Sequence, residues 1–82
     1  MTKLFLRKNG CAPCNRVKEA IDIEKFKNSG AEIIFLDEVS SDELQNYKTE
    51  FKLRTVPTYV SDTLTIADSQ RIIDLLKPGY GK

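Results

Sequence analysis

The chain of 82 residues contains no histidine and only two cysteines, and these shortages exclude several kinds of site. A nucleophile assisted by histidine is ruled out by composition. A zinc site is disfavoured, because zinc needs about four protein ligands that are usually cysteine and histidine. Two cysteines so close together could close only a very small loop, so they are not the disulfide framework of a secreted protein. We therefore expect no bound metal.

The sequence also lacks an excess of charge and a long apolar run. A formal net charge of +1 offers no case for nucleic acid or for an acidic membrane surface as a partner. No apolar run is long enough to span a bilayer, and Met1-Thr2-Lys3 leads directly into a strand pattern instead of a signal peptide. We expect one monomeric, cytoplasmic domain over residues 1–82, near the lower size limit for a self-sufficient core.

The two cysteines, Cys11 and Cys14, enclose Ala12-Pro13 at the point where a strand pattern passes into a helical pattern. A C-x-x-C at such a junction is typical of a redox dithiol. Cys11 would sit at the helix N-terminus, where free N–H groups and the helix dipole favour a thiolate. Cys14 would lie about one turn further on, close enough to attack a mixed disulfide and release the substrate. The sequence thus predicts a nucleophilic Cys11 and a resolving Cys14.

The segment around the cysteines carries charge of one sign only. The first acid is Glu19, and the cations that precede it are Lys3, Arg7, Lys8, Arg16 and Lys18. Cations close to a thiol lower its pKa. We assign this function to Lys8 and Arg16, whereas Lys3 and Lys18 fit a solvated basic face equally well.

Three helices are predicted from their end signals. The first runs from about Pro13 to a stop at Ser29-Gly30. The second follows the capping signature Ser40-Ser41-Asp42-Glu43. The third follows Asp68-Ser69 and stops at Pro78-Gly79.

Hydrophobic patterns complete the predicted fold. Strands are expected over residues 2–7, 33–36, 56–60 and 64–66. The resulting order is β-α-β-α-β-β-α, in which the first β-α-β unit needs a parallel pair and the last hairpin adds an antiparallel edge. The sequence therefore predicts an α/β fold with a four-stranded mixed sheet and three helices.

Two motifs resemble those of the glutaredoxins, which have a thioredoxin fold. The segment from Lys8 to Lys18 resembles the glutaredoxin active site, with a basic residue three before the first cysteine and an Arg-x-Lys pair after the second. Arg54-Thr55-Val56-Pro57 resembles the Thr-Val-Pro loop of the family, whose proline is cis and lies against the dithiol. The length and the element order agree over nearly the whole chain. The resemblance therefore implies a thioredoxin/glutaredoxin fold with a cis Val56-Pro57 bond.

The same resemblance implies a dithiol–disulfide oxidoreductase that reduces protein or mixed disulfides through Cys11 and Cys14. The residues implied in substrate or glutathione binding are Lys8, Arg16, Thr55, Val56, Pro57, Asp68 and Ser69. No bound cofactor is required. The implied partners are a disulfide-containing protein, with ribonucleotide reductase as one candidate, and glutathione or a thioredoxin-reductase-like flavoprotein as the reductant.

The sequence departs from the glutaredoxins in two places. Ala12-Pro13 replaces the usual Pro-Tyr, so that a proline precedes the second cysteine as in thioredoxin. Glutaredoxins hold the γ-glutamyl end of glutathione with Gly-Gly and, three residues later, Asp; the corresponding positions here are Ala67-Asp68 and Arg71. An acid thus stands near the expected place of glutathione's α-carboxylate. Either glutathione binds in another way, or the protein is thioredoxin-like and is reduced by thioredoxin reductase. A non-catalytic thioredoxin-fold binding module is a further alternative.

Overall fold

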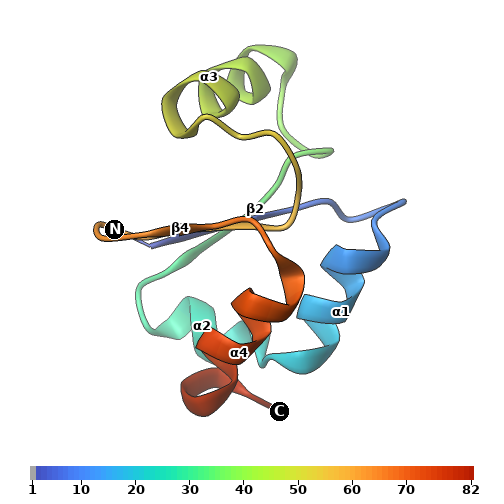
Figure 1. Cartoon of the computed structure of the whole chain (residues 1–82). Helices are drawn as coiled ribbons and strands as arrows, with labels where there is room; N and C mark the ends of the chain where they lie inside the picture. The colour runs from blue at the N-terminus through green and yellow to red at the C-terminus, as the bar shows by residue number, and fades with distance from the viewer. Residues whose placement is uncertain (1) are drawn as a thin grey trace.

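The computed structural model describes residues 2–82, which form three layers with a sheet in the middle (Figure 1). The strands and helices are β1 Lys3–Leu6, α1 Ala12–Ala20, α2 Ile23–Asn28, β2 Glu32–Phe35, α3 Ser41–Phe51, β3 Thr58–Val60, β4 Thr65–Ile66 and α4 Ser69–Tyr80. Helices α1, α2 and α4 cover one face of the sheet, and α3 alone covers the other (Figure 1). Among residues 2–82, no helix is both long enough and apolar enough to cross a membrane.

The sheet has four strands in the order β2-β1-β3-β4. The central strand β1 pairs in parallel with β2 and antiparallel to β3. The short strand β4 adds an antiparallel edge to β3. The predicted α/β fold with a mixed four-stranded sheet is therefore confirmed.

The alternating side chains of β1 divide the core into two parts. Leu4 and Leu6 are fully buried on the side of α1 and α4, and that cluster also includes Cys14, Val17, Ile21, Phe26, Ile72, Ile73 and Leu76. Phe5 is fully buried on the other side, where its ring centroid lies 5.3 Å from that of Tyr47 and 5.2 Å from that of Phe51. A strand that is apolar on both faces is expected where helices cover both faces of a sheet.

The predicted first helix is wrong in one respect: the chain forms α1 and α2 in its place, so the described residues hold four helices, not three. Ile21 between them is extended, with φ −117° and ψ 156°, and bridges to Gly81 near the C-terminus. Asp22 then caps α2, where its carboxylate accepts the N–H of Lys25 at 3.2 Å. The helix breaks because Ile21 pairs with a distant segment and Asp is a favoured N-cap residue.

Helix α4 continues past the predicted stop at Pro78-Gly79 and ends at Tyr80. A proline in the last turn removes only one helical hydrogen bond. The turn is closed by the N–H of Gly81, which donates to the carbonyl of Lys77 at 2.8 Å. The Tyr80 ring packs edge-on against Phe26, with the ring centroids 5.3 Å apart, and so joins the end of α4 to α2.

Candidate active site

Cys11 ends the loop between β1 and α1 and is the N-cap residue of α1. Its sulfur atom accepts a hydrogen bond from the backbone N–H of Cys14 at 3.3 Å. Pro13 lies in the first turn, where helical residues have no intrahelical N–H bond to lose. The positive end of the helix dipole and the N–H of Cys14 both favour a negatively charged sulfur at Cys11.

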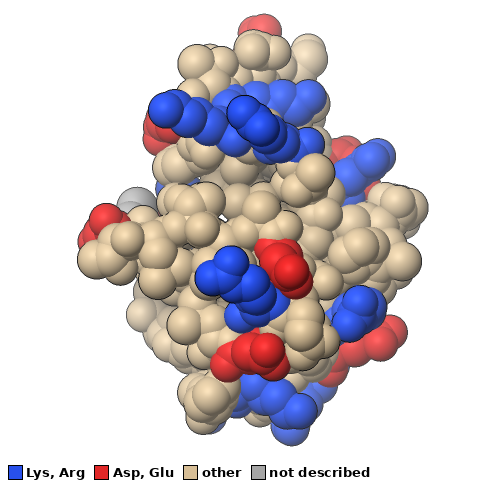
Figure 2. Space-filling model, in the orientation of Figure 1, with Lys and Arg blue, Asp and Glu red and all other residues tan. Residues whose placement is uncertain are grey.

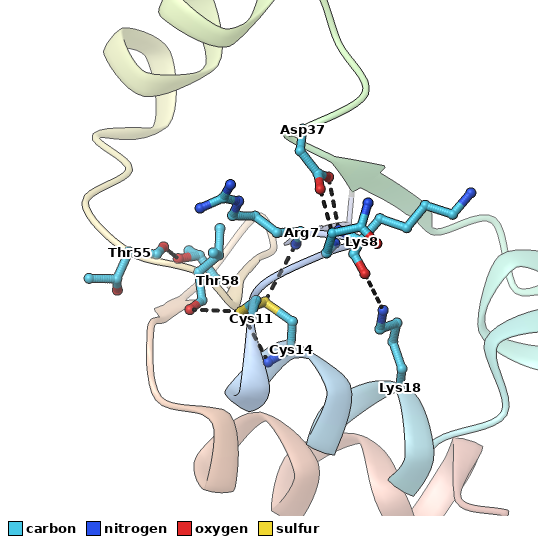
Figure 3. Close-up of a disulfide and its surroundings, with 10 residues drawn as sticks. Arg7, Lys8, Cys11, Cys14, Lys18, Asp37, Thr55 and Thr58 are labelled. Carbon is cyan, nitrogen blue, oxygen red and sulfur yellow. Dashed lines mark hydrogen bonds between the residues drawn. A yellow bond between two sulfur atoms is a disulfide. The ribbon is translucent and has the colours of Figure 1, made fainter.

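The sulfur atoms of Cys11 and Cys14 are at disulfide-bonding distance, and their Cα atoms are 5.3 Å apart. Cys14 is fully buried, while 9% of the Cys11 surface is exposed, so Cys11 is the more accessible of the two cysteines. The Cys14 sulfur accepts the backbone N–H of Arg7 at 3.4 Å (Figure 3). Within the described residues, no group of three or more potential His, Cys, Asp or Glu ligands could hold a metal ion.

The loop that precedes β3 lies against the cysteines. Its Val56–Pro57 peptide bond is cis, as predicted, and the carbonyl oxygen of Val56 lies 3.9 Å from the Cys11 sulfur. Thr58 is only 3% exposed, and its hydroxyl donates to the carbonyl of Thr55 at 2.7 Å (Figure 3). The pairing of β3 with β1 ends at Thr58, so the backbone of Val56 lies outside the ladder.

Asp37, which sequence reasoning missed, holds the loop on the other side of the cysteines. Its two carboxylate oxygens accept the backbone N–H groups of Lys8 at 2.8 Å and Asn9 at 3.0 Å (Figure 3). The hydrogen bond from Lys8 is the largest cause that lowers the pKa of Asp37; partial desolvation opposes it, and the N–H of Asn9 and the charge of Arg7 add to it. The only signal in the sequence was an acid directly after a buried apolar run, which does not reveal a partner so distant along the chain.

Lys8 and Arg16, which we expected to support the thiolate, interact with other groups. The Lys8 ammonium lies 3.2 Å from the Glu38 carboxylate, and the Arg16 guanidinium donates to the Gln70 side chain on α4 at 3.1 Å. Figure 3 shows the Lys8 side chain directed away from the disulfide. No hydrogen bond or ion pair within residues 2–82 joins either side chain to a sulfur atom. Their effect on the thiolate therefore stays a prediction that rests on charge at a distance.

Asp68 and Ser69, which we expected near glutathione, form the start of α4. Asp68 is its N-cap residue, and one carboxylate oxygen accepts the N–H groups of Gln70 at 2.8 Å and Arg71 at 3.3 Å. Ser69 is the first helical residue. A helix N-terminus commonly binds an anion with such N–H groups. Here the chain's own carboxylate already accepts two of them.

The fold and this arrangement of a C-x-x-C opposite a cis-proline loop define the class of protein as one with a thioredoxin fold. Residues 6–82 match the family model described as Glutathione S-transferase, N-terminal domain. The chain therefore belongs to this family, whose N-terminal domain has a thioredoxin fold. The comparison with curated proteins and the comparison with solved structures each find no match.

Proposed function

We propose that the protein is a dithiol–disulfide oxidoreductase of glutaredoxin type. The observation that carries this proposal is the pair Cys11 and Cys14, at disulfide-bonding distance, with Cys11 at the N-terminus of α1 and 3.9 Å from Val56 O. Domains of this family are not all oxidoreductases, and one reactive group suffices for binding or transferring a thiol. A second cysteine at bonding distance from the first is what allows the protein to resolve its own mixed disulfide.

The proposed reaction starts from a Cys11 thiolate and a Cys14 thiol. Cys11 attacks one sulfur of the substrate disulfide, so that a mixed disulfide forms and the other substrate sulfur leaves as a thiolate that takes a proton from water. Cys14 loses its proton to water and attacks the Cys11 sulfur, which forms the Cys11–Cys14 disulfide and releases the second substrate thiolate. The substrate gains the two electrons that the protein dithiol loses.

Backbone N–H groups supply the electrostatic support for both steps. The N–H of Cys14 points to the Cys11 sulfur at 3.3 Å and favours the thiolate that makes the first attack. The N–H of Arg7, 3.4 Å from the Cys14 sulfur, favours negative charge on Cys14 at the moment of the second attack. This support depends on the backbone, so it does not require Lys8 or Arg16 to touch a sulfur.

The loop of Thr55, Val56 and Pro57 is the proposed docking ledge for the substrate. The backbone of Val56 lies beyond the β1–β3 ladder, so it is free of that pairing and can bind an extended chain by strand addition. The Thr58 hydroxyl holds the carbonyl of Thr55 and keeps this ledge in place. The ledge therefore presents a substrate disulfide to Cys11, the more exposed of the two cysteines.

The start of α4 bears on which molecule reduces the Cys11–Cys14 disulfide. The family description names glutathione, which supports it as a partner. However, the Asp68 carboxylate accepts the N–H groups that a glutathione carboxylate would need at the start of α4, and Arg71 stands where the resemblance expects an acid. Like charges brought together without a cation between them repel. We propose that glutathione is a poor reductant here and that a thioredoxin-reductase-like flavoprotein is the alternative, with ribonucleotide reductase as one candidate substrate.

Trapping the mixed disulfide tests the proposed function. With a disulfide peptide as substrate, Cys14→Ser should accumulate a covalent adduct visible by intact-mass spectrometry, whereas Cys11→Ser should form none. If the unaltered, reduced protein leaves the peptide disulfide intact, the protein is a binding module instead. If alkylation at neutral pH labels Cys14 before Cys11, the roles of the two cysteines are reversed.

A further inference from the structure

A groove on the α3 side of the cysteines adjoins the docking ledge and extends beyond it. It has a volume of about 520 Å³ and lies between α3, the end of β2 and the loop before β3. Val56 lines it, and the carbonyl of the same residue lies 3.9 Å from the Cys11 sulfur. Arg7 lines it as well, and its backbone N–H reaches the Cys14 sulfur. The groove therefore begins where a bound substrate would extend past the disulfide.

The floor of the groove is apolar and only partly covered. Leu36 is buried, whereas Leu44, Leu53 and Val56 are partly exposed and pack against the cluster around Phe5. An apolar side chain placed on this floor would remove the exposed surface from water, which is the usual source of affinity in a concave site.

The rim of the groove is basic, and no ion pair among residues 2–82 includes one of its cations. Its cations are Arg7, Lys48 and Arg54, whereas those ion pairs are Lys3–Glu32 and Lys8–Glu38. The one acid in the lining is Asp37, whose oxygens accept the backbone N–H groups of the loop before Cys11. Figure 2 shows basic side chains gathered along the side of the α3 layer that faces the sheet, and Figure 3 shows Arg7 extending toward Thr55.

The lining holds three cations and one carboxylate, that of Asp37, whose pKa the charge of Arg7 helps to lower. Positive charge is therefore in excess, chiefly at Lys48 and Arg54, and it attracts an anion. An apolar floor beneath them adds a preference for an apolar group next to that anion.

We infer that this groove binds the segment that flanks the disulfide of a protein substrate, with an apolar side chain on the floor and an Asp or Glu side chain between Arg7, Lys48 and Arg54. This inference rests on the proposed function, because the segment reaches the groove only if its disulfide lies at Cys11. It assigns a substrate preference: disulfides in segments that carry an apolar residue beside an acid.

Three peptides test the inference, each with one internal disulfide and identical except for a flanking pair: Leu-Glu, Leu-Gln or Ser-Glu. Pre-reduced protein is mixed with excess peptide, and oxidation of the protein is followed in a single turnover without any other reductant. The dependence of the rate on peptide concentration separates the half-saturation concentration from the maximal rate. We expect the Leu-Glu peptide to half-saturate at a concentration severalfold lower than the other two, with a similar maximal rate for all three.

Variants locate the effect in the groove. The double change Lys48→Gln and Arg54→Gln should abolish the preference for Glu over Gln while the Leu-Gln peptide still oxidises the protein. The control is Lys25→Gln combined with Lys27→Gln, which removes the same charge from exposed residues of α2, on the opposite face of the sheet. The control should keep the preference, and raising the salt concentration should weaken it in the unaltered protein.

The outcomes separate the two proposals. If all three peptides oxidise the protein at the same half-saturation concentration, the function stands and the groove inference is wrong. The inference is also wrong if the double variant is oxidised more slowly by oxidised glutathione but not by the Leu-Glu peptide, because the groove then binds glutathione and not the peptide segment. If none of the peptides oxidises the protein, the proposed function itself is wrong.

Discussion

Asp37 shows how one exposed side chain can position the active-site loop. It lies just beyond β2, and its carboxylate accepts two consecutive N–H groups, of Lys8 and Asn9, at 2.8 and 3.0 Å. The loop continues through Gly10, which has a positive φ of 68°, to Cys11. Hydrogen bonds to a charged acceptor are stronger than those between neutral groups. Asp37 therefore acts as a positioning residue for Cys11 and touches no sulfur itself.

We predict that Asp37→Asn loosens this loop. An asparagine keeps one carbonyl oxygen but turns an NH₂ group toward the second N–H donor, so one hydrogen bond is lost and the charge disappears. Hydrogen exchange at Lys8 and Asn9 should become severalfold faster. Glu38→Gln is the matched control, since Glu38 loses the same charge but pairs only with the Lys8 ammonium. Equal exchange in both variants would show that the two hydrogen bonds do not hold the loop.

The lowered pKa of Asp37 predicts how the loop responds to acid. A carboxyl whose pKa is lower in the folded state stabilises that state at pH values above its ordinary pKa of 3.8. This stabilisation is lost as the pH falls through the folded-state pKa. After correction for intrinsic exchange, protection of the Lys8 and Asn9 amides should be constant near neutral pH and fall only below about pH 4. The Asp37→Asn variant should show no such step, and a step that persists in it would assign the effect to another group.

At the scale of elements, the start of α4 is capped by a carboxylate of the chain itself. Asp68 satisfies two N–H groups of the helix with its own carboxylate. Asp68→Ala should therefore cost about 1 kcal/mol of stability, whereas Asp68→Gly should cost only a few tenths, as is usual for an N-cap residue. The measurement is the shift of the urea midpoint at neutral pH. A larger loss with glycine than with alanine would contradict the capping role.

The same position should control the reductant. Asp68→Gly frees the N–H groups of Gln70 and Arg71 for a ligand carboxylate, and Arg71→Asp adds an acid for the glutathione ammonium. We expect each change to raise turnover with glutathione and glutathione reductase as the electron source. Turnover with dithiothreitol should stay the same and is the control. If both variants leave the glutathione-dependent rate unchanged, and this rate already matches a typical glutaredoxin, our interpretation of this loop is wrong.

At the scale of the whole molecule, the α3 layer depends on the sheet for its attachment. Helix α3 contains no buried residue of its own, and its aromatic side chains pack on the fully buried Phe5. Phe5→Ala should cost about 3–5 kcal/mol, a large part of the roughly 5–15 kcal/mol that a domain has in total. Urea unfolding measures the loss, with Leu75→Ala on the exposed face of α4 as the control. Equal shifts in the two variants would show that the Phe5 cluster does not hold the layers together.

Local features of the sequence were sufficient for much of this fold and for the cysteine pair. The Ser40 cap and the Asp68 cap were predictable because each side chain bonds N–H groups two or three residues away. Cys11 at the start of α1 followed from the same local rule, and the buried strand β2 followed from its apolar run. These features depend on neighbours along the chain, which a single sequence displays directly.

The tertiary structure alone decided the features that join distant residues. Ile21 ends α1 because it pairs with Gly81, and neither residue signals the other in the sequence. Asp37 reaches Lys8 and Asn9 only after β2 has paired with β1. The groove exists because α3 and the loop before β3 meet beside the residues that follow β1 and β2. Each of these depends on which elements lie side by side, and local propensity does not encode that arrangement because it is set by long-range packing.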